Sequence, residues 1–211
     1  MFGVNDFWLF VVSDIALNLI PGPDSLYIIG RSASQGFRAG SSAALGIGAG
    51  TLVHILAAAF GLSAILATSA TAFTLVKIIG CIYLFYIGFS MLLSKGNDNT
   101  TESPNQQKTS LSKIFYQGFL TNALNPKVAL FFLAFVPQFI AHDAPSKALA
   151  FIFLGLVFNV NGMIWCHFLA WSSSSLSVKI KHNKLITNAF NKLAGCLFIG
   201  FGLKLVLSKQ S

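Results

Sequence analysis

Residues 39–76 read AGSSAALGIGAGTLVHILAAAFGLSAILATSATAFTLV, and this stretch contains no Asp, Glu, Lys or Arg. A helix that spans a bilayer needs roughly 20 predominantly apolar residues. The stretch is therefore long enough for parts of two such helices and a short turn. Residues 148–178 form a second run without Asp, Glu, Lys or Arg. Together the two runs predict that the chain lies in lipid.

The composition of the chain indicates the same class of protein. Of the 211 residues, 55% are hydrophobic and 9% are charged, whereas soluble domains carry about 25% charged residues. The formal net charge of +8 is spread over the ends of apolar runs. This distribution is typical of charges that set membrane orientation, and it argues against a nucleic-acid surface. Asp6 and Asp14 interrupt the first apolar run, so we do not interpret it as a cleavable signal peptide.

The apolar runs predict an all-α integral membrane protein with six transmembrane helices. We place the helices at residues 5–30, 38–66, 71–94, 113–141, 147–172 and 186–208. The chain then divides into a first three-helix half (1–94), a polar linker (95–112) and a second three-helix half (113–211). Connections one, three and five carry eight Lys or Arg residues against three on the opposite side. This asymmetry predicts that the linker is cytoplasmic and that both termini lie outside.

Two segments of the chain are similar to each other. Residues 77–84 read KIIGCIYL and residues 192–199 read KLAGCLFI, so Lys, Gly and Cys coincide. Prolines also interrupt the first and fourth predicted helices, at Pro23-Asp24 and Pro126-Lys127. Three helices is an odd number, so a second copy would enter the membrane from the other side. The chain is therefore predicted to contain two inverted repeats, and transporters of this design bind substrate near the midplane, where broken helices meet.

The proline interruptions fall well inside apolar runs. Pro21, Gly22 and Pro23 are expected to break the first helix and Pro126 the fourth, because proline lacks an N–H and displaces a turn of helix. Lipid offers no partner to the freed backbone groups. One interpretation is that the breaks line a polar cavity, where the positive end of the next half-helix favours a carboxylate. The other interpretation is a kink that serves packing alone.

Asp24 and Lys127 are ionisable groups at membrane depth, where each costs roughly 2.5–3.5 kcal/mol at a helix centre. They occupy equivalent positions of the predicted repeat, and two interpretations remain open. Either they form a structural ion pair, or Asp24 binds the ammonium and Lys127 the carboxylate of a zwitterionic substrate. Asn122 and Asn125 complete this candidate substrate site with hydrogen-bonding groups, although Asn before Pro is also ordinary turn chemistry.

Asp14 is a further acidic residue in an apolar run, with no obvious partner nearby in the sequence. Because burial favours the protonated form of a carboxylic acid, Asp14 and Asp24 are candidates for proton coupling. The alternative for Asp14 is an interfacial side chain in contact with water. His54 and His167 are expected to be hydrogen-bonded core histidines, and Lys77 is expected to reach the membrane interface.

No sequence pattern indicates an enzyme or a metal site. Cys81, Cys166 and Cys196 lie in apolar runs without CxxC spacing, as expected of buried small side chains. The chain contains no Walker A, GxSxG or HExxH pattern. We therefore expect a protein that is not an enzyme and that needs no cofactor.

The quoted motifs resemble those of a known family. PGPD at residues 21–24, ALGIGAG at 44–50 with His54, and KIIGCIYLFYIG at 77–88 resemble the first three helices of the LysE/RhtB family of bacterial amino-acid exporters. GFLTNALNPKVALFFLAFVPQF at residues 118–139 resembles its fourth helix and is the most specific match. The resemblance covers nearly the whole chain. It implies a transporter of the bacterial inner membrane that exports amino acids such as threonine, homoserine, leucine or lysine, driven by the proton gradient.

Two other functions remain open. An exporter of metal ions or other small solutes, or an electron carrier of the wider superfamily, is the nearest alternative. A metal exporter would recruit ligands such as His54, His167, Asp14 and Asp24, but no HxxxD pattern occurs. The other alternative is a membrane protein with a purely structural role. The expected partners are the amino-acid substrate, lipid and the proton gradient, and the small residues at 39–51 allow close helix approach and hence a homodimer.

Overall fold

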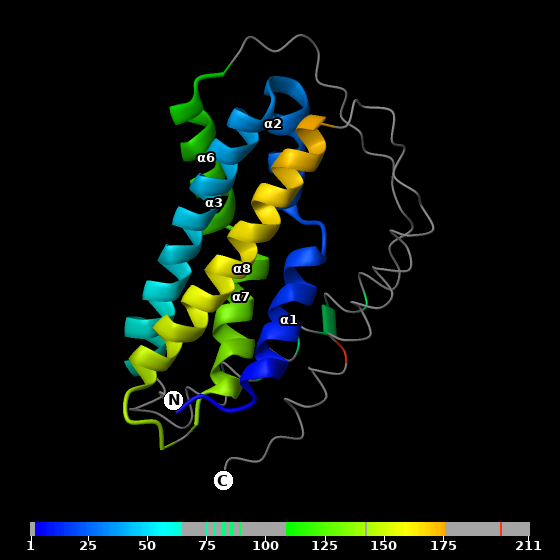
Figure 1. The fold of residues 1–211 in the computed structure, drawn as a ribbon. Coiled ribbons are helices and arrows are strands. Elements are labelled where there is room, and N and C mark those ends of the chain that lie inside the picture. Colours follow the sequence, from blue (N-terminus) through cyan, green and yellow to red (C-terminus); the bar gives the residue numbers. More distant parts are fainter. Residues whose placement is uncertain are drawn as a thin grey trace.

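A computed structural model of the protein describes residues 3–64, 109–141 and 143–175, together with positions 75, 78, 82, 85, 86, 89 and 199. Figure 1 shows this part as a bundle of helices packed side by side. Within it, the only pairing of extended residues is an isolated bridge between Val4 and Ile140. The described part is therefore all-helical, as predicted. The predicted helices at 71–94 and 186–208, most of the linker, and Lys77, Cys81 and Cys196 lie outside the described residues, apart from the isolated positions.

The first predicted helix consists of two helices in the structure. α1 (Phe7–Leu19) ends before Ile20, whose backbone is extended, and α2 (Pro23–Gln35) begins with Pro23 in its first turn. Proline is tolerated there because the N–H that it lacks would have no helical partner. Gly36 follows α2 with φ 81°, a conformation that glycine adopts at no steric cost. The chain therefore turns sharply between α2 and the next helix.

The fourth predicted helix also consists of shorter pieces. α6 (Leu111–Ala123) begins after Ser110, whose hydroxyl accepts a hydrogen bond from the Lys113 N–H at 3.4 Å. α7 (Pro126–Leu130) begins at Pro126 and continues through the π-helical segment η2 (Phe131–Phe135) and the 3₁₀ turn η3 (Val136–Phe139). The segment Pro126–Phe139 is bent by 43° from α6.

Two long helices complete the described bundle. α3 (Phe37–Leu56) continues into the π-helical segment η1 (Ala57–Leu62), and α8 covers Lys147–Ser175. The spans Phe37–Leu62 and Lys147–Ser175 contain 26 and 29 residues and are long and apolar enough to cross a membrane. The bent pair of α6 with Pro126–Phe139 adds a third candidate if it is one span. These elements agree with the helices predicted at 38–66, 113–141 and 147–172.

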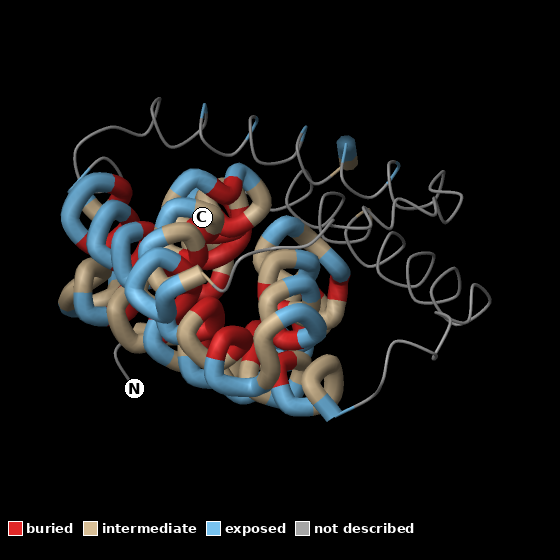
Figure 2. Tube along the Cα trace, turned by 90° about the horizontal axis from the view of Figure 1, so that it is seen from above, coloured by how far each residue is buried: buried red, intermediate tan, exposed pale blue. Residues whose placement is uncertain are grey.

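The outer surface of the bundle is apolar. Trp8, Phe60 and Ile164 are 78%, 67% and 66% exposed. In Figure 2, most exposed residues lie on the outer sides of the helices, and most buried residues lie on the sides towards the middle of the bundle. Large contiguous apolar surfaces are uncommon on soluble monomers. Together with the long apolar helices, this surface fits a multi-pass membrane protein.

α3 packs against α6 with almost no side chain between the two backbones. A Cβ atom added to Gly46 would overlap the carbonyl group of Phe115, and one added to Gly118 would lie 2.6 Å from the carbonyl oxygen of Ala43. Small residues allow helices to approach this closely. The small residues at 39–51 thus serve packing inside one chain, and they give no support to the expected homodimer.

The two ends of the described bundle are held by different interactions. At the end near the N-terminus, aromatic rings form part of one buried cluster that includes Phe10, Phe131, Phe135, Phe139 and Phe158. At the opposite end, Gln117 Oε1 lies 3.0 Å from the Tyr27 hydroxyl and accepts a hydrogen bond of 2.9 Å from Arg31. These polar contacts join α2 to α6. The candidate site lies between the two ends.

Candidate functional site

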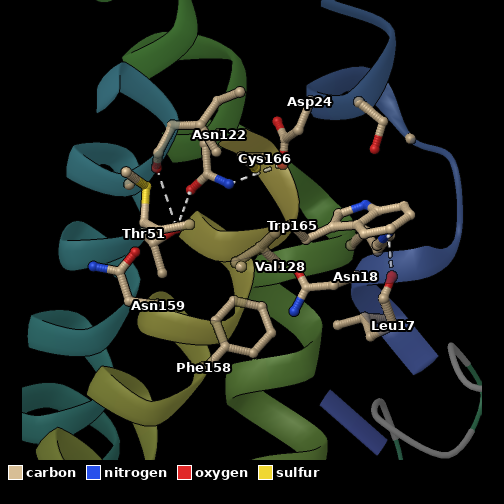
Figure 3. A pocket seen from close by; sticks show the side chains of 17 residues that line it. Leu17, Asn18, Asp24, Thr51, Asn122, Val128, Phe158, Asn159, Trp165 and Cys166 are labelled. Carbon is tan, nitrogen blue, oxygen red and sulfur yellow. Dashed lines mark hydrogen bonds between the residues drawn. The ribbon is translucent and has the colours of Figure 1, made fainter. Parts of the chain in front are cut away.

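A cavity lies where the interruption between α1 and α2 faces the interruption between α6 and α7 (Figure 3). Its lining comes from α1, α2, α3, α6, α7 and α8, and from Gly22 before α2. Its volume of about 40 Å³ holds a few water molecules, since one water needs roughly 10–15 Å³ by the same measure. Three of the four predicted substrate-site residues, Asp24, Asn122 and Lys127, line this cavity.

Asp24 is held by side chains from the facing interruption. Its Oδ2 atom accepts hydrogen bonds from Asn122 Nδ2 at 2.9 Å and from Asn125 Nδ2 at 3.0 Å. Its Oδ1 atom is buried and has no hydrogen-bond partner among the described residues. Because an ionised carboxylate accepts hydrogen bonds at both oxygens, Asp24, which lines the cavity, has an unused acceptor.

The two asparagines are themselves fixed by their surroundings. Asn125 precedes α7, and its Oδ1 accepts a hydrogen bond from the Lys127 N–H at 3.0 Å, which leaves its Nδ2 to donate to Asp24. Asn122 Oδ1 lies 3.2 Å from the Thr51 hydroxyl, and the Asn122 carbonyl oxygen lies 2.9 Å from His54 Nε2. The side chain of Asn125 therefore caps α7 and bonds to Asp24 at the same time.

Lys127 contacts the end of α1. Its Nζ donates hydrogen bonds to the carbonyl oxygens of Leu17 at 3.0 Å and Ile20 at 3.1 Å. These carbonyls lie at the C-terminal end of a helix, where a positive charge is favourable. No ion pair joins Lys127 to Asp24 within the part of the chain that the structure describes. Both charges line the same cavity, but each is held by other groups.

Asp14 has partners that the sequence did not reveal. It is fully buried, and its two carboxylate oxygens accept hydrogen bonds of 2.6 Å each from Asn18 Nδ2 and Asn161 Nδ2. Asn18 lies one helical turn after Asp14 and also lines the cavity. Since Asp14 is buried among these amides, the predicted alternative of an interfacial side chain is wrong for this structure.

His54 is hydrogen-bonded in the core, as predicted, whereas His167 is hydrogen-bonded but only half-buried, so the prediction of a core position is wrong for His167. His54 stacks on Phe132 with ring centroids 6.2 Å apart and lies close to the Asn122 carbonyl. His167 Nδ1 lies 2.9 Å from the Met163 carbonyl oxygen, and its Nε2 lies 3.2 Å from the Ser41 hydroxyl. Among the described residues, no three His, Cys, Asp or Glu side chains gather where a metal ion could bind. Cys166 is buried and lines the cavity.

Sequence reasoning missed several groups at the site. Thr51 and Trp165 line the cavity, and Asn161 bonds to Asp14. Asn18 had a local signal, because residues four apart on a helix are neighbours. The other three come from distant segments of the chain. No spacing in the sequence distinguishes them from packing residues.

Comparison with known proteins adds a family and several relatives. The sequence profile of the LysE type translocator family matches residues 15–209. The chain is 29% identical over 208 residues to the leucine efflux protein of Salmonella typhimurium, which covers 97% of this chain and 96% of that protein. It is also 29% identical over 212 residues to an uncharacterised membrane protein of Pseudomonas aeruginosa, with 99% and 98% covered. No solved structure matches the chain at a significant level.

Proposed function

Because this chain belongs to the LysE type translocator family, we propose that it is a secondary active transporter that exports small amino acids or their derivatives across the bacterial inner membrane. Relatives that match almost its entire length are named leucine efflux proteins. Leucine is therefore the first substrate to test, followed by threonine, homoserine and lysine.

The observation that carries this proposal is the cavity between the two helix interruptions, which is lined by Asp24, whose Oδ1 atom has no hydrogen-bond partner among the described residues. A substrate ammonium is the natural partner for that oxygen, while Asn122 and Asn125 hold the other one. Lys127 adds positive charge beside the substrate carboxylate and keeps the end of α1 in place. Asp24, Asn122, Asn125 and Lys127 form the proposed substrate site, with Pro21, Gly22, Pro23 and Pro126 shaping the interruptions.

We assign proton coupling to Asp14 and Asp24. Both are carboxylates held by two side-chain amides, and Asn18 links Asp14 to the cavity. A buried acid that gains and loses a proton during the transport cycle would couple export to the proton gradient. Protonation of Asp24 would also release a substrate ammonium from its oxygen.

The proposed architecture has six transmembrane helices in two inverted halves, residues 1–94 and 113–211, joined by a cytoplasmic linker. The parallel between the two interruptions supports this arrangement. In each, a helix ends, a proline begins the next helix, and a charged residue follows that proline. Such broken helices at corresponding places are typical of the substrate sites of inverted-repeat transporters.

The test uses purified protein in vesicles loaded with radiolabelled leucine. We expect efflux that requires the protein and becomes faster with an imposed proton gradient. Asp24→Asn should abolish efflux while the protein remains folded, and Asp143→Asn, at an exposed position outside the cavity, should not. Vesicles that export none of the four amino acids, or that export cadmium instead, would refute the proposal.

A further inference from the structure

We propose that the indole N–H of Trp165 binds the substrate carboxylate, so that the site recognises an α-amino-acid zwitterion between Asp24 and Trp165. This inference rests on the proposed export function, and it adds a specificity-determining residue. Trp165 lies on α8 and lines the same cavity as Asp24. Figure 3 shows its indole ring in the space between Asp24 and Leu17 in that view.

Buried polar atoms without a partner point to this residue. Among the described residues, four such side-chain atoms occur: Asp24 Oδ1, Ser32 Oγ, Gln35 Nε2 and Trp165 Nε1. Only Asp24 and Trp165 line the cavity. A buried polar atom without a hydrogen bond is unfavourable, and such atoms are rare enough in native proteins to need an explanation. A ligand that bonds to both atoms supplies one.

The chemistry of the two atoms defines that ligand. Trp Nε1 can only donate a hydrogen bond, and an ionised carboxylate can only accept. The missing partner of Trp165 is therefore an acceptor, and the missing partner of Asp24 is a donor. An α-amino acid carries a carboxylate and an ammonium on the same carbon atom. The pair of unpartnered atoms is thus complementary to the head group that all amino acids share.

Lys127 is less suited to be the sole carboxylate ligand. Two of the three hydrogens on an ammonium group are needed for its bonds to the carbonyl oxygens of Leu17 and Ile20. One hydrogen remains for the substrate. The indole N–H of Trp165 is uncommitted within the described part of the chain, so a carboxylate can accept from both residues without disturbing the end of α1.

The test compares Trp165→Phe, which removes the N–H and keeps an aromatic ring, with Trp171→Phe. Trp171 lies on the same helix and is 59% exposed, so it serves as the matched control. We expect Trp165→Phe to raise the half-saturating leucine concentration roughly tenfold or more, the effect of losing a hydrogen bond to a charged group. It should leave the weak binding of 3-methylbutylamine, which lacks the carboxylate, unchanged. Trp171→Phe should change neither.

A second measurement does not depend on the stability of that variant. The chain contains three Trp residues, so Trp8→Phe with Trp171→Phe leaves Trp165 as the only indole. Its fluorescence should shift when leucine is added, with the same half-saturation as transport. Unchanged fluorescence under saturating leucine, or unchanged leucine affinity in a folded Trp165→Phe protein, would overturn the inference alone. Failure of the wild-type protein to bind any amino acid would overturn the proposed function as well.

Discussion

Asp24 and Lys127 each follow a helix-initiating proline, and each bonds to the interruption on which the other lies. Asp24, in the first turn of α2, accepts from Asn122 and Asn125 at the α6–α7 interruption. Lys127, in the first turn of α7, donates to Leu17 and Ile20 at the α1–α2 interruption. The two interruptions therefore stabilise each other through both charges without a direct ion pair. This reciprocal arrangement makes separate predictions for the two residues.

Lys127→Met should destabilise the protein, because the carbonyl oxygens of Leu17 and Ile20 lose a charged donor. We expect the free energy of unfolding to fall by about 2–3 kcal/mol. Chemical unfolding of the purified protein in detergent measures this change. Lys113→Met is the matched control, since Lys113 is exposed at the start of α6. Equal losses of unfolding free energy in Lys127→Met and Lys113→Met would contradict the stabilising role that we give to Lys127.

The double variant Asp24→Asn with Lys127→Met distinguishes two separate sets of hydrogen bonds from an ion pair between Asp24 and Lys127. We expect its loss of stability to exceed that of either single variant, because Asp24 and Lys127 bond to different groups. Transport should remain lost, since Asp24 holds the substrate in our proposal. A structural ion pair predicts instead that the second substitution restores stability, and restored export would move the substrate site elsewhere.

Asp14→Asn should uncouple export from the proton gradient. The substitution keeps the side-chain shape but removes the titrating group between Asn18 and Asn161. We expect leucine exchange between the two sides of a vesicle to continue, while acceleration by an imposed proton gradient disappears. Comparing the two rates in the same vesicles separates coupling from substrate binding. Gradient-driven export at the wild-type rate would assign coupling to another group.

Gly46→Ala should destabilise the contact between α3 and α6, because the added Cβ overlaps the Phe115 carbonyl. Forcing extra atoms into a packed interior costs about 1–3 kcal/mol, and thermal unfolding in detergent should show the loss. Gly30→Ala is the control, since an added Cβ there meets no atom within 4 Å. Helix propensity favours Ala over Gly, so the control should be neutral or slightly stabilising.

The orientation in the membrane can be tested at exposed positions of the described bundle. Ser34, near the end of α2, and Asp143, before α8, are exposed. The end of α2 and the start of α8 lie at opposite ends of the bundle in Figure 1. In a protein without its native cysteines, Asp143→Cys should react with an impermeant thiol reagent in intact cells, and Ser34→Cys only after permeabilisation. The reverse pattern would invert the orientation derived from the Lys and Arg distribution.

Local chemical signals explain what the sequence could predict. Asp24, Asn122 and Lys127 were identifiable because proline marks an interruption and because charge in an apolar run is costly. Their placement on one cavity agrees with that reasoning, although their role in binding stays a prediction. The run of small residues at 39–51 can also be seen in the sequence, but the helix that packs against it cannot. Only the structure shows that α6 of the same chain covers it.

The remaining features depend on groups that carry no sequence signal. Lys127 bonds to backbone carbonyls, which every residue possesses, so the sequence suggested Asp24 as its partner instead. Asn161 reaches Asp14 across 147 positions of the chain, and no spacing rule connects them. Trp165 looks like an ordinary aromatic residue of an apolar helix. Its proposed role rests on an indole nitrogen that has no partner in the described part of the chain and on its place in the lining of the same cavity as Asp24.

The backbone contact between Gly46 on α3 and Phe115 on α6 has a mechanical consequence. Side chains can change rotamer to let two helices slide past each other, but backbone carbonyl groups cannot move in this way. We therefore expect α3 and α6 to keep their relative position during transport. α3 belongs to the first proposed half of the chain and α6 to the second, so we expect the movement during transport to occur at the interruptions between α1 and α2 and between α6 and α7. A covalent cross-link between α3 and α6 should leave leucine export running. A cross-link across the interruption between α1 and α2 should stop leucine export.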